Sequence, residues 1–300
     1  MTPYFGAELD SIAAAIGEHT GVAFEALSVK PVGGGSIHRG WHFDDGLRHF
    51  FVKTGEIAAA PMFAAEAQGL HALSAAAVVR TPTVIALGQT GSKAFLVLEH
   101  LELKALDTTG GARLGSALAQ LHRIRGDSFG WTADNFIGST PQNNASHHSW
   151  PYFFGERRLR KQLELALQNG MQRALVAKSY GLIERIGGLF IDYRPVPSLL
   201  HGDLWSGNAA QISGGSPVIF DPACYYGDRE TDIAMAELFG GFPISFYAAY
   251  RAEWPLDRGY ETRKTLYNLY HIINHFNLFG GAYLGQAQRM IEGLLAELKR

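Results

Sequence analysis

The chain reads Leu199-Leu200-His201-Gly202-Asp203-Leu204-Trp205-Ser206-Gly207-Asn208 and, a little further on, Val218-Ile219-Phe220-Asp221-Pro222. In both stretches an apolar run leads to a carboxylate, and Asn208 follows Asp203 five positions later. Phosphoryl transfer needs such a set, because one Asp orients the attacking hydroxyl and accepts its proton while an Asn and a second Asp hold magnesium. The spacing makes Asp203 a candidate catalytic residue and makes Asn208 and Asp221 candidate magnesium ligands.

The same residues have a simpler interpretation as a turn between two strands. Asp, Asn, Gly and Ser form turns for purely local reasons. The kinase catalytic loop reads His-Arg-Asp with an Asn five positions on, but here Gly202 replaces the Arg. Asp221-Pro222-Ala223 stands where protein kinases carry Asp-Phe-Gly. The choice depends on whether the N-terminal third supplies a nucleotide-binding lobe.

The N-terminal third has the pattern of a small antiparallel sheet preceded by an amphipathic helix over 7–19. The glycines between the first two predicted strands, Gly33, Gly34 and Gly35, allow backbone amides to approach phosphates closely. They do not form a Walker A loop, since neither Gly-Lys-Ser/Thr nor a helix follows. The alternative is a flexible hairpin tip. Strands are predicted over 26–32, 37–43, 48–54, 84–87 and 94–101.

Lys53 favours the nucleotide-binding interpretation. It lies near the end of the third predicted strand, where kinases place the Lys that contacts phosphates and pairs with a Glu of the next helix. That helix is predicted over about 60–77, and Glu66 is its only acidic residue. A surface Lys–Glu pair would contribute only about 0–1 kcal/mol. A single Glu on an Ala-rich, apolar helix is better explained by a buried Lys partner.

The chain crosses to a second lobe near residue 103, which predicts lobes over 1–103 and 104–300. Glu99, His100 and Leu101 stand at the crossover, where backbone groups receive the adenine edge. A polar loop is predicted over 125–150, and Asp232 is expected to brace the catalytic loop from the start of a helix. Helices are predicted from 108, over 150–170 and over 171–189, and the stretch 225–232 is predicted to open a helix that runs through 239. Two or three further helices are predicted over 243–254 and from 263 to about 299.

Composition narrows the class of protein. The chain has 300 residues, 47% of them hydrophobic, and a net charge of −2 without a long basic run. We therefore expect a globular protein that does not bind nucleic acid. No apolar run reaches bilayer length and no signal-peptide pattern begins the chain, so we expect a cytoplasmic enzyme without membrane association. The single cysteine, Cys224, excludes an internal disulfide, and we expect it to be buried and unreactive.

The order of glycine loop, Lys, Glu, crossover, catalytic Asp and Asn, and metal Asp resembles the protein-kinase-like fold. That fold is α+β and bilobal, with a five-stranded antiparallel sheet plus a helix in the N-lobe and a mostly α-helical C-lobe. Within it, the chain resembles the fructosamine-3-kinase (ketosamine kinase) family over nearly its whole length. The run at 203–208 separates this family from aminoglycoside phosphotransferases and choline kinases, which share only the His, Asp and Asn. The resemblance rests on 51–53, 62–67, 69–70, 135–138, Thr140, Gln142, 158–159, 201–208, 221–223 and 227–230.

The resemblance implies ATP-dependent phosphorylation of a sugar hydroxyl on a ketosamine, at O3 in fructosamines, with Mg²⁺ as cofactor. Such adducts form when sugars react with amines, so the family resembles a deglycation repair system. Trp205, Tyr225 and Asp228 are candidates for the sugar pocket, although Trp205 and Tyr225 could equally serve in packing. Ser36 stands where eukaryotic members carry the Cys of redox-sensitive dimers, so we expect no such regulation and a monomer.

Two rival functions remain open. One is another small-molecule kinase that acts on an aminoglycoside, choline or a protein-free sugar, although no dense acidic run suggests an aminoglycoside pocket. The other is a non-catalytic, kinase-shaped binding protein, although the Lys, the catalytic Asp and the metal ligands are all present. The sequence does not decide which ketosamine is preferred, or whether it is free or protein-bound.

Overall fold

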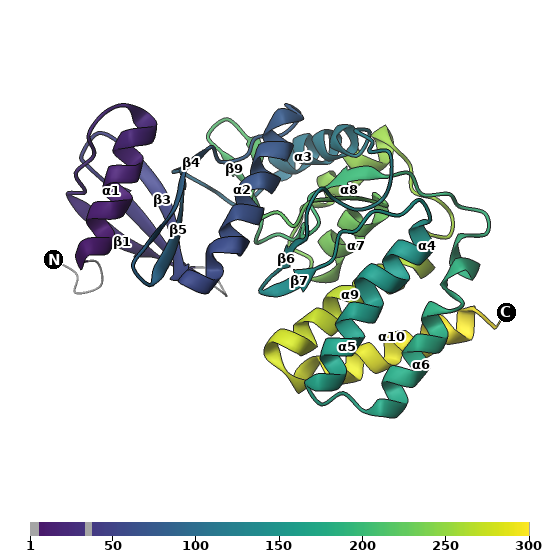
Figure 1. The fold of residues 1–300 in the computed structure, drawn as a ribbon. Helices are drawn as coiled ribbons and strands as arrows, with labels where there is room; N and C mark the ends of the chain where they lie inside the picture. Colours follow the sequence, from purple (N-terminus) through teal and green to yellow (C-terminus); the bar gives the residue numbers. More distant parts are fainter. Residues whose placement is uncertain (1–5, 34–37, 300) are drawn as a thin grey trace.

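The structure is a computed structural model that describes residues 6–33 and 38–299 (Figure 1). Within these residues, five strands form one antiparallel sheet in the order β1-β2-β3-β5-β4, which confirms the predicted sheet. The chain leaves β5 at Glu99, and the boundary near residue 103 stays a prediction. The strands are β1 (Ser28–Val32), β2 (Arg39–Asp44), β3 (His49–Glu56), β4 (Val84–Thr90) and β5 (Lys93–Glu99).

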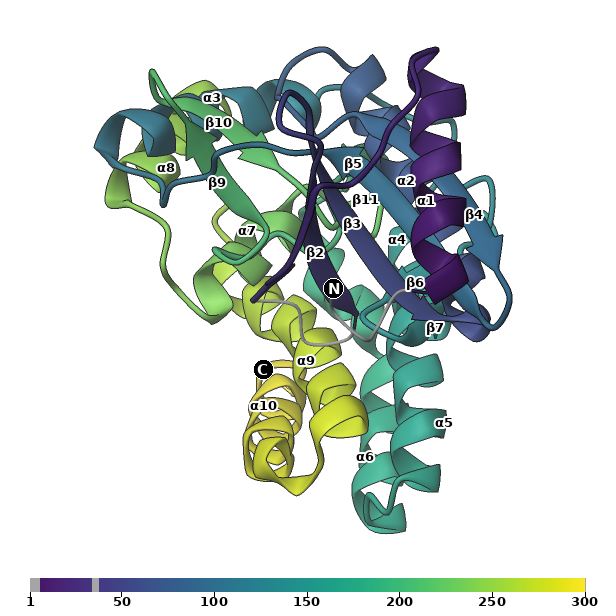
Figure 2. The ribbon, with the colours of Figure 1, turned by 90° about the vertical axis from the view of Figure 1, so that its left-hand side faces the viewer.

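Two helices cover the two faces of this sheet. Side chains alternate between the faces of a strand, so β3 directs Phe50 and Val52 into the apolar core beneath α1 (Gly6–Thr20). The intervening Phe51 packs against the core beneath α2 (Ala60–Ala75), and Lys53 shares its face. Helix α1 lies on the outer side of the sheet, and α2 lies between the sheet and the C-lobe (Figures 1 and 2).

Helix α2 forms where the sequence predicts it. Ala-rich sequence favours a helix, and Pro61 suits the first turn because no helical hydrogen bond needs its missing N–H. A short 3₁₀ turn, η1 (Ile57–Ala59), leads into α2 from β3. Leu73, near the end of α2, and Val79, just beyond it, belong to the apolar core of the C-lobe. The helix therefore connects the packing of both lobes.

The C-lobe is mainly helical and carries three short hairpins or strand pairs. The pairs are β6 (Asn135–Ile137) with β7 (Thr140–Gln142), β8 (Ser198–Leu200) with β11 (Tyr225–Gly227), and β9 (Ala209–Ile212) with β10 (Ser216–Ile219). The helices are α3 (Thr108–Leu121), α4 (Trp150–Tyr152), the π-helix η2 (Phe153–Leu159), α5 (Arg160–Gln168), α6 (Arg173–Ile183), the 3₁₀ turn η3 (Ile186–Phe190), α7 (Glu230–Leu238), α8 (Ile244–Glu253), α9 (Tyr260–Phe279), the 3₁₀ turn η4 (Gly281–Tyr283) and α10 (Leu284–Glu297).

Two predictions about the C-lobe need correction. The helix predicted over 150–170 is interrupted by the π-helix η2, where Gly155 lets Ile183 of α6 approach closely. The region predicted as a polar loop over 125–150 contains the β6–β7 hairpin, and its polar side chains turn inward. Gln142 Nε2 donates to Asn135 Oδ1 at 2.8 Å, and Tyr270 OH donates to Gln142 Oε1 at 2.7 Å. Polar side chains that have hydrogen-bond partners are commonly buried, so polarity alone does not show that a segment is a loop exposed to solvent.

Candidate active site

A cleft between the lobes, with a volume of about 540 Å³, gathers most of the predicted site residues. Gly34, Gly35 and Ser36 lie outside the described residues. The cleft is also lined by Phe136 and Gly138 of the β6–β7 hairpin, to which the sequence analysis assigned no role in the site. The predicted residues that line it are Gly33, Lys53, Glu66, Glu99, His100, Leu101, Asp203, Trp205, Asn208 and Asp221.

Lys53 joins the two lobes through its ammonium group. Its Nζ donates to Glu66 Oε1 at 2.8 Å and also forms an ion pair with Asp221. The predicted contact between Lys53 and Glu66 is therefore present, and both side chains are almost buried. Burial alone would lower the pKa of Lys53, but the carboxylates of Asp221 and Glu66 raise it above its ordinary value. The cation is retained at any physiological pH.

The position of Glu66 depends on a close contact one turn further along α2. A Cβ on Gly69 would stand 3.0 Å from Pro222 Cγ and 3.4 Å from Cys224 Sγ. The Cys224 thiol is buried as expected and lies 3.7 Å from the carbonyl oxygen of Gly69. Glycine at position 69 thus lets the helix that carries Glu66 pack directly on the segment that carries Asp221.

Asp232, at the start of α7, holds the loop that contains His201, Gly202 and Asp203 (the catalytic loop), as predicted. Asp232 Oδ2 accepts from the His201 backbone N–H at 2.8 Å, and Oδ1 accepts from that of Gly202 at 2.9 Å. His122 Nε2 lies 3.1 Å from Asp232 Oδ2, and both side chains are fully buried. His122 is thus a buried core residue with hydrogen-bond partners for both ring nitrogens. Two backbone donors and an imidazole fix the carboxylate, which in turn fixes the loop that presents Asp203.

Gly202 is required by the backbone of this loop. Its φ is +83°, a conformation that glycine adopts readily and other residues rarely adopt. A Cβ there would stand only 2.1 Å from the carbonyl oxygen of Ala223. The Ala223 backbone N–H donates to the His201 carbonyl at 2.8 Å, so the two segments are tightly joined. This contact explains why glycine replaces the arginine of protein kinases.

His201 orients the start of the loop as a neutral imidazole. Its Nδ1 accepts from the Asp203 backbone N–H at 3.2 Å, which leaves Nε2 to donate to the Phe220 carbonyl at 2.9 Å. The ring is fully buried, and burial lowers the pKa of His201 below its ordinary value. One side chain therefore connects the catalytic loop to the residue that precedes Asp221.

Asn208 and Asp221 form an oxygen-rich corner of the cleft. Asn208 Nδ2 donates to the Asp203 carbonyl at 2.9 Å and to Asp203 Oδ2 at 3.2 Å, so its Oδ1 faces away from these acceptors. Asp221 adopts a φ of +56°, a strained conformation for a residue with a Cβ, and such strain concentrates at functional sites. One carboxylate and one amide oxygen suit Mg²⁺, which usually completes its coordination with water and phosphate.

The amide oxygen of Asn208 and the carboxylate of Asp221 fit Mg²⁺, which usually binds few protein ligands, better than a metal that is coordinated only by protein side chains. No group of three or more His, Cys, Asp or Glu side chains that could hold a metal occurs over residues 6–33 and 38–299. Nearby, burial and the Asp221 carboxylate raise the pKa of Asp203 to about 7. Asp203 is thus more basic than an ordinary aspartate.

Trp205 lies at the rim of this cleft with 36% of its surface exposed. A Cβ on Gly207 would stand 2.3 Å from the indole ring, so glycine leaves room for the ring to fold back over the loop. A Cβ on Gly241 would likewise meet Ser206 Oγ at 2.4 Å. The run Trp-Ser-Gly is therefore a packing unit that places one aromatic ring beside Asp203.

The structure does not bring Tyr225 or Asp228 to the cleft. Tyr225 is buried in β11, where the guanidinium of Arg158 lies 4.2 Å from the ring centroid. Asp228 is fully buried and accepts hydrogen bonds from the hydroxyls of Tyr193 and Tyr267. Their predicted role in the sugar pocket has no geometric support. Both residues hold the C-lobe together instead.

Arg158 is a structural residue that the sequence analysis did not assign. Its side chain is fully buried, and its Nη2 donates to Asn144 Oδ1 at 2.7 Å while its Nη1 donates to the Asn143 carbonyl at 2.5 Å. Asn135 Nδ2 donates to the Cys224 carbonyl at 2.8 Å. Together these contacts fix the hairpin that lines the cleft. The signal in the sequence was the pair Arg158-Leu159, which is one of the stretches that carry the family resemblance.

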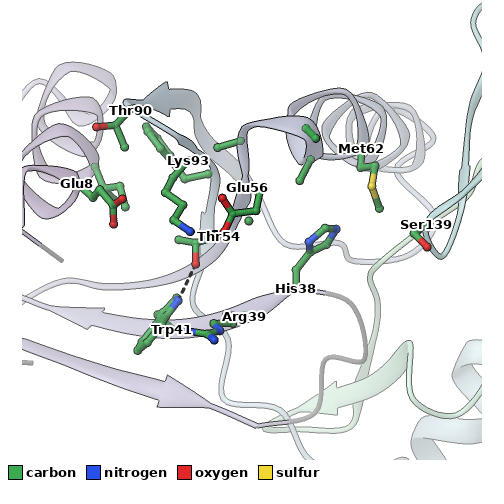
Figure 3. A pocket seen from close by; sticks show the side chains of 16 residues that line it. Glu8, His38, Arg39, Trp41, Thr54, Glu56, Met62, Thr90, Lys93 and Ser139 are labelled. Atoms are coloured by element: carbon green, nitrogen blue, oxygen red, sulfur yellow. Dashed lines mark hydrogen bonds and ion pairs between the residues drawn. The ribbon is translucent and has the colours of Figure 1, made fainter. Parts of the chain in front are cut away.

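At the crossover, the Glu99 side chain is held by residues just before β4, and its backbone N–H donates to the Thr83 carbonyl at 2.9 Å. It pairs with Arg80 and accepts from the Thr83 hydroxyl at 3.1 Å. A second pocket of about 470 Å³ adjoins the cleft through His38 and Met62, which line both (Figure 3). Its polar groups include the Lys93–Glu56 ion pair and the hydrogen bond from Trp41 Nε1 to Thr54 Oγ1.

Comparisons with known proteins agree with this geometry. Over the described residues, no helix is both long and apolar enough to cross a bilayer. A choline kinase from Streptococcus pneumoniae has the same fold, with a TM-score of 0.63 and 16% identity over 96% of this chain and 98% of its own. A candidate fructosamine-3-kinase from Haemophilus somnus is more similar, with a TM-score of 0.88 and 30% identity over 95% and 96% of the two chains.

Sequence relatives are more similar still. A probable ketoamine kinase from Synechocystis is 46% identical over 95% of this chain and 96% of its own. The chloroplastic protein-ribulosamine 3-kinase of Arabidopsis thaliana is 40% identical over 93% and 86% of the two chains. The sequence model of the fructosamine kinase family matches residues 8–297. This chain therefore belongs to the fructosamine kinase family.

Proposed function

We propose that the protein phosphorylates a sugar hydroxyl of a ketosamine, at O3, with ATP and Mg²⁺. The observation that carries the proposal is the meeting of Asp203, Asn208, Asp221 and Lys53 in one cleft, beside the Trp205 ring. Family membership adds the substrate class, because the relatives are named ketoamine and ribulosamine kinases. We further propose a cytoplasmic monomer that acts in the repair of glycated amines.

The residues of the cleft have distinct tasks in this reaction. Asp203 accepts a hydrogen bond from the attacking hydroxyl and takes its proton, which is the task of a general base. Lys53, held by Glu66, contacts the nucleotide phosphates. Asn208 and Asp221 would hold Mg²⁺, which supplies charge neutralisation to the transferring phosphoryl group. Most of the rate then arises from positioning and electrostatic stabilisation.

The test measures ATP-dependent phosphorylation of ribulosamine and fructosamine by the wild type and by Asp203→Asn. Asn keeps the shape of Asp but cannot accept a proton, so we expect kcat to fall by about 10²–10⁴-fold. Lys53→Met should raise the KM for ATP, and Ile191→Ala, at an exposed position outside the cleft, serves as the control. Equal turnover by the wild type and Asp203→Asn would refute the mechanism. Turnover of choline or an aminoglycoside in place of ketosamines would refute the substrate assignment.

A further inference from the structure

A row of aromatic rings leads away from the rim of the cleft. The ring of Trp205 lies 6.4 Å from that of Phe239, and Phe239 lies 5.0 Å from His275. His275 lies 5.5 Å from Phe279 and 5.1 Å from Tyr283. We call Phe239, His275, Phe279 and Tyr283 the aromatic strip. Each ring contacts the next at a separation typical of favourable aromatic pairs, so the strip is a continuous surface.

Phe239 and Phe279 of the strip are exposed, and His275 and Tyr283 are half-buried. Phe239 is 43% exposed and Phe279 is 52% exposed, and Trp205 continues the exposed surface into the cleft. Single exposed hydrophobic residues are ordinary, but contiguous ones mark a binding surface. The turn between α9 and α10, drawn in yellow, lies at the lower end of the C-lobe, below the sheet of the N-lobe (Figure 2). The strip meets the cleft through the Trp205 ring, which lines the cleft and lies beside Phe239.

The backbone holds the strip in place. Phe239 directly follows α7, and the two glycines after it adopt positive φ values of +67° and +92° that turn the chain sharply. The Nδ1 of His275 lies 2.7 Å from the carbonyl oxygen of His271 one turn earlier in α9, which fixes the imidazole ring. Phe279 ends α9, and Tyr283 ends the following 3₁₀ turn η4. Ordered rings bind with little loss of entropy, so the strip is suited to recognition.

The chemistry of the proposed substrate indicates what would cover the strip. A ketosamine has a sugar part, whose C3 hydroxyl must reach Asp203, and an amine part attached at C1. Only C2 separates C1 from C3, so the amine part must leave the catalytic position close to Asp203. Trp205 follows Asp203 by two residues and connects directly to the strip. The amine part is therefore the group that the strip is placed to meet.

We propose that the aromatic strip binds an apolar group carried by the amine part of the substrate. The enzyme then favours ketosamines of bulky apolar amines over those of small polar amines. A short polar amine part would reach only the Trp205 ring, whereas an aromatic or long aliphatic amine part would contact several rings of the row. This inference rests on the proposed function, since it assigns a subsite to the same reaction.

The test compares two ribulosamines, one made from phenethylamine and one from ethanolamine. We expect the wild type to show a KM at least about fivefold lower for the phenethylamine adduct, because burial of one aromatic contact has about this effect. Phe279→Ala and Tyr283→Ala should bring this preference close to one, with kcat for the phenethylamine adduct changed less than twofold. Ile191→Ala, with 79% of its side chain exposed on a different segment, should keep the wild-type preference.

Binding measured by calorimetry on Asp203→Asn separates the two proposals. A preference for the phenethylamine adduct in binding, without turnover by the wild type, would support the strip and refute the proposed function. Equal KM and equal binding for both adducts would overturn the strip, as would a preference that Phe279→Ala leaves unchanged. A dimer of the wild type that Phe279→Ala converts to monomer would also overturn it, since a second copy would then cover the rings.

Discussion

Replacing Gly202 by alanine tests whether the backbone of the catalytic loop dictates its sequence. Two effects add at this position, because φ is +83° and because the new Cβ would stand 2.1 Å from the Ala223 carbonyl oxygen. The left-handed conformation alone costs about 1–2 kcal/mol for a residue with a Cβ. The contact cannot be relieved by a side-chain rotation, since the opposing atom belongs to the backbone. We expect a total destabilisation of about 3–4 kcal/mol.

Gly214 provides a matched control for this prediction. It has the same φ of +83°, but a Cβ there would have no atom within 4 Å. Gly214→Ala should therefore cost only the conformational part, about 1–2 kcal/mol. The difference between the two variants isolates the contact between the catalytic loop and the segment that follows Asp221.

The assay is urea unfolding followed by tryptophan fluorescence, with kcat measured on the same preparations. We expect Gly202→Ala to lose activity beyond what its stability explains, because relief of the contact must move Asp203 relative to Asp221. Equal unfolding free energies for Gly202→Ala and Gly214→Ala would refute the reasoning. Retention of wild-type kcat in Gly202→Ala would show that the catalytic loop tolerates the shift.

Three further predictions concern buried polar groups. Glu66→Gln should raise the KM for ATP about tenfold or more in steady-state kinetics, since Lys53 loses the charged partner that positions it; an unchanged KM would contradict this. Asp232→Asn replaces an acceptor of two backbone hydrogen bonds and should lower the unfolding free energy by about 1–3 kcal/mol in urea titration; a loss under about 0.5 kcal/mol would exclude the bracing role. His271 is buried with its pKa lowered to about 3, so the unfolded chain takes up a proton below about pH 6.5 that the folded chain does not. Its contribution to the unfolding free energy should fall by about 2 kcal/mol from pH 7 to pH 5, and His271→Gln should show a shallower pH dependence than the wild type.

The sheet and the charged residues of the site could be predicted because each depends on local pattern. The alternation of β3 places Lys53 on the face opposite Phe50 and Val52, and α2 must then cover that face. The spacing of Asp203 and Asn208 is likewise a property of one loop. These features require only the periodicity of a strand and the length of a turn.

The buried polar contacts and the position of Tyr225 could not be predicted, because they depend on partners that are distant in sequence. The polar residues Asn135 and Gln142 suggested a solvated loop, because the sequence does not show the Cys224 carbonyl and the Tyr270 hydroxyl that satisfy them. Tyr225 was assigned to the sugar pocket because it lies close to Asp221 in sequence. However, β11 pairs with β8 inside the C-lobe and carries Tyr225 away from the cleft. Proximity along the chain does not determine which way a strand faces.

The relative positions of Lys53, Glu66 and Asp221 also depend on an uncharged contact between α2 and the segment that follows Asp221. Glu66 and Gly69 lie three residues apart on α2, so they occupy neighbouring positions on one face of the helix. Glu66 contacts Lys53 of the sheet, while Gly69 contacts Pro222 and Cys224 directly after Asp221. A larger residue at position 69 would move α2 away from Pro222 and lengthen the path from Glu66 through Lys53 to Asp221. The geometry of Lys53, Glu66 and Asp221 is therefore set by how closely one glycine lets the two lobes approach.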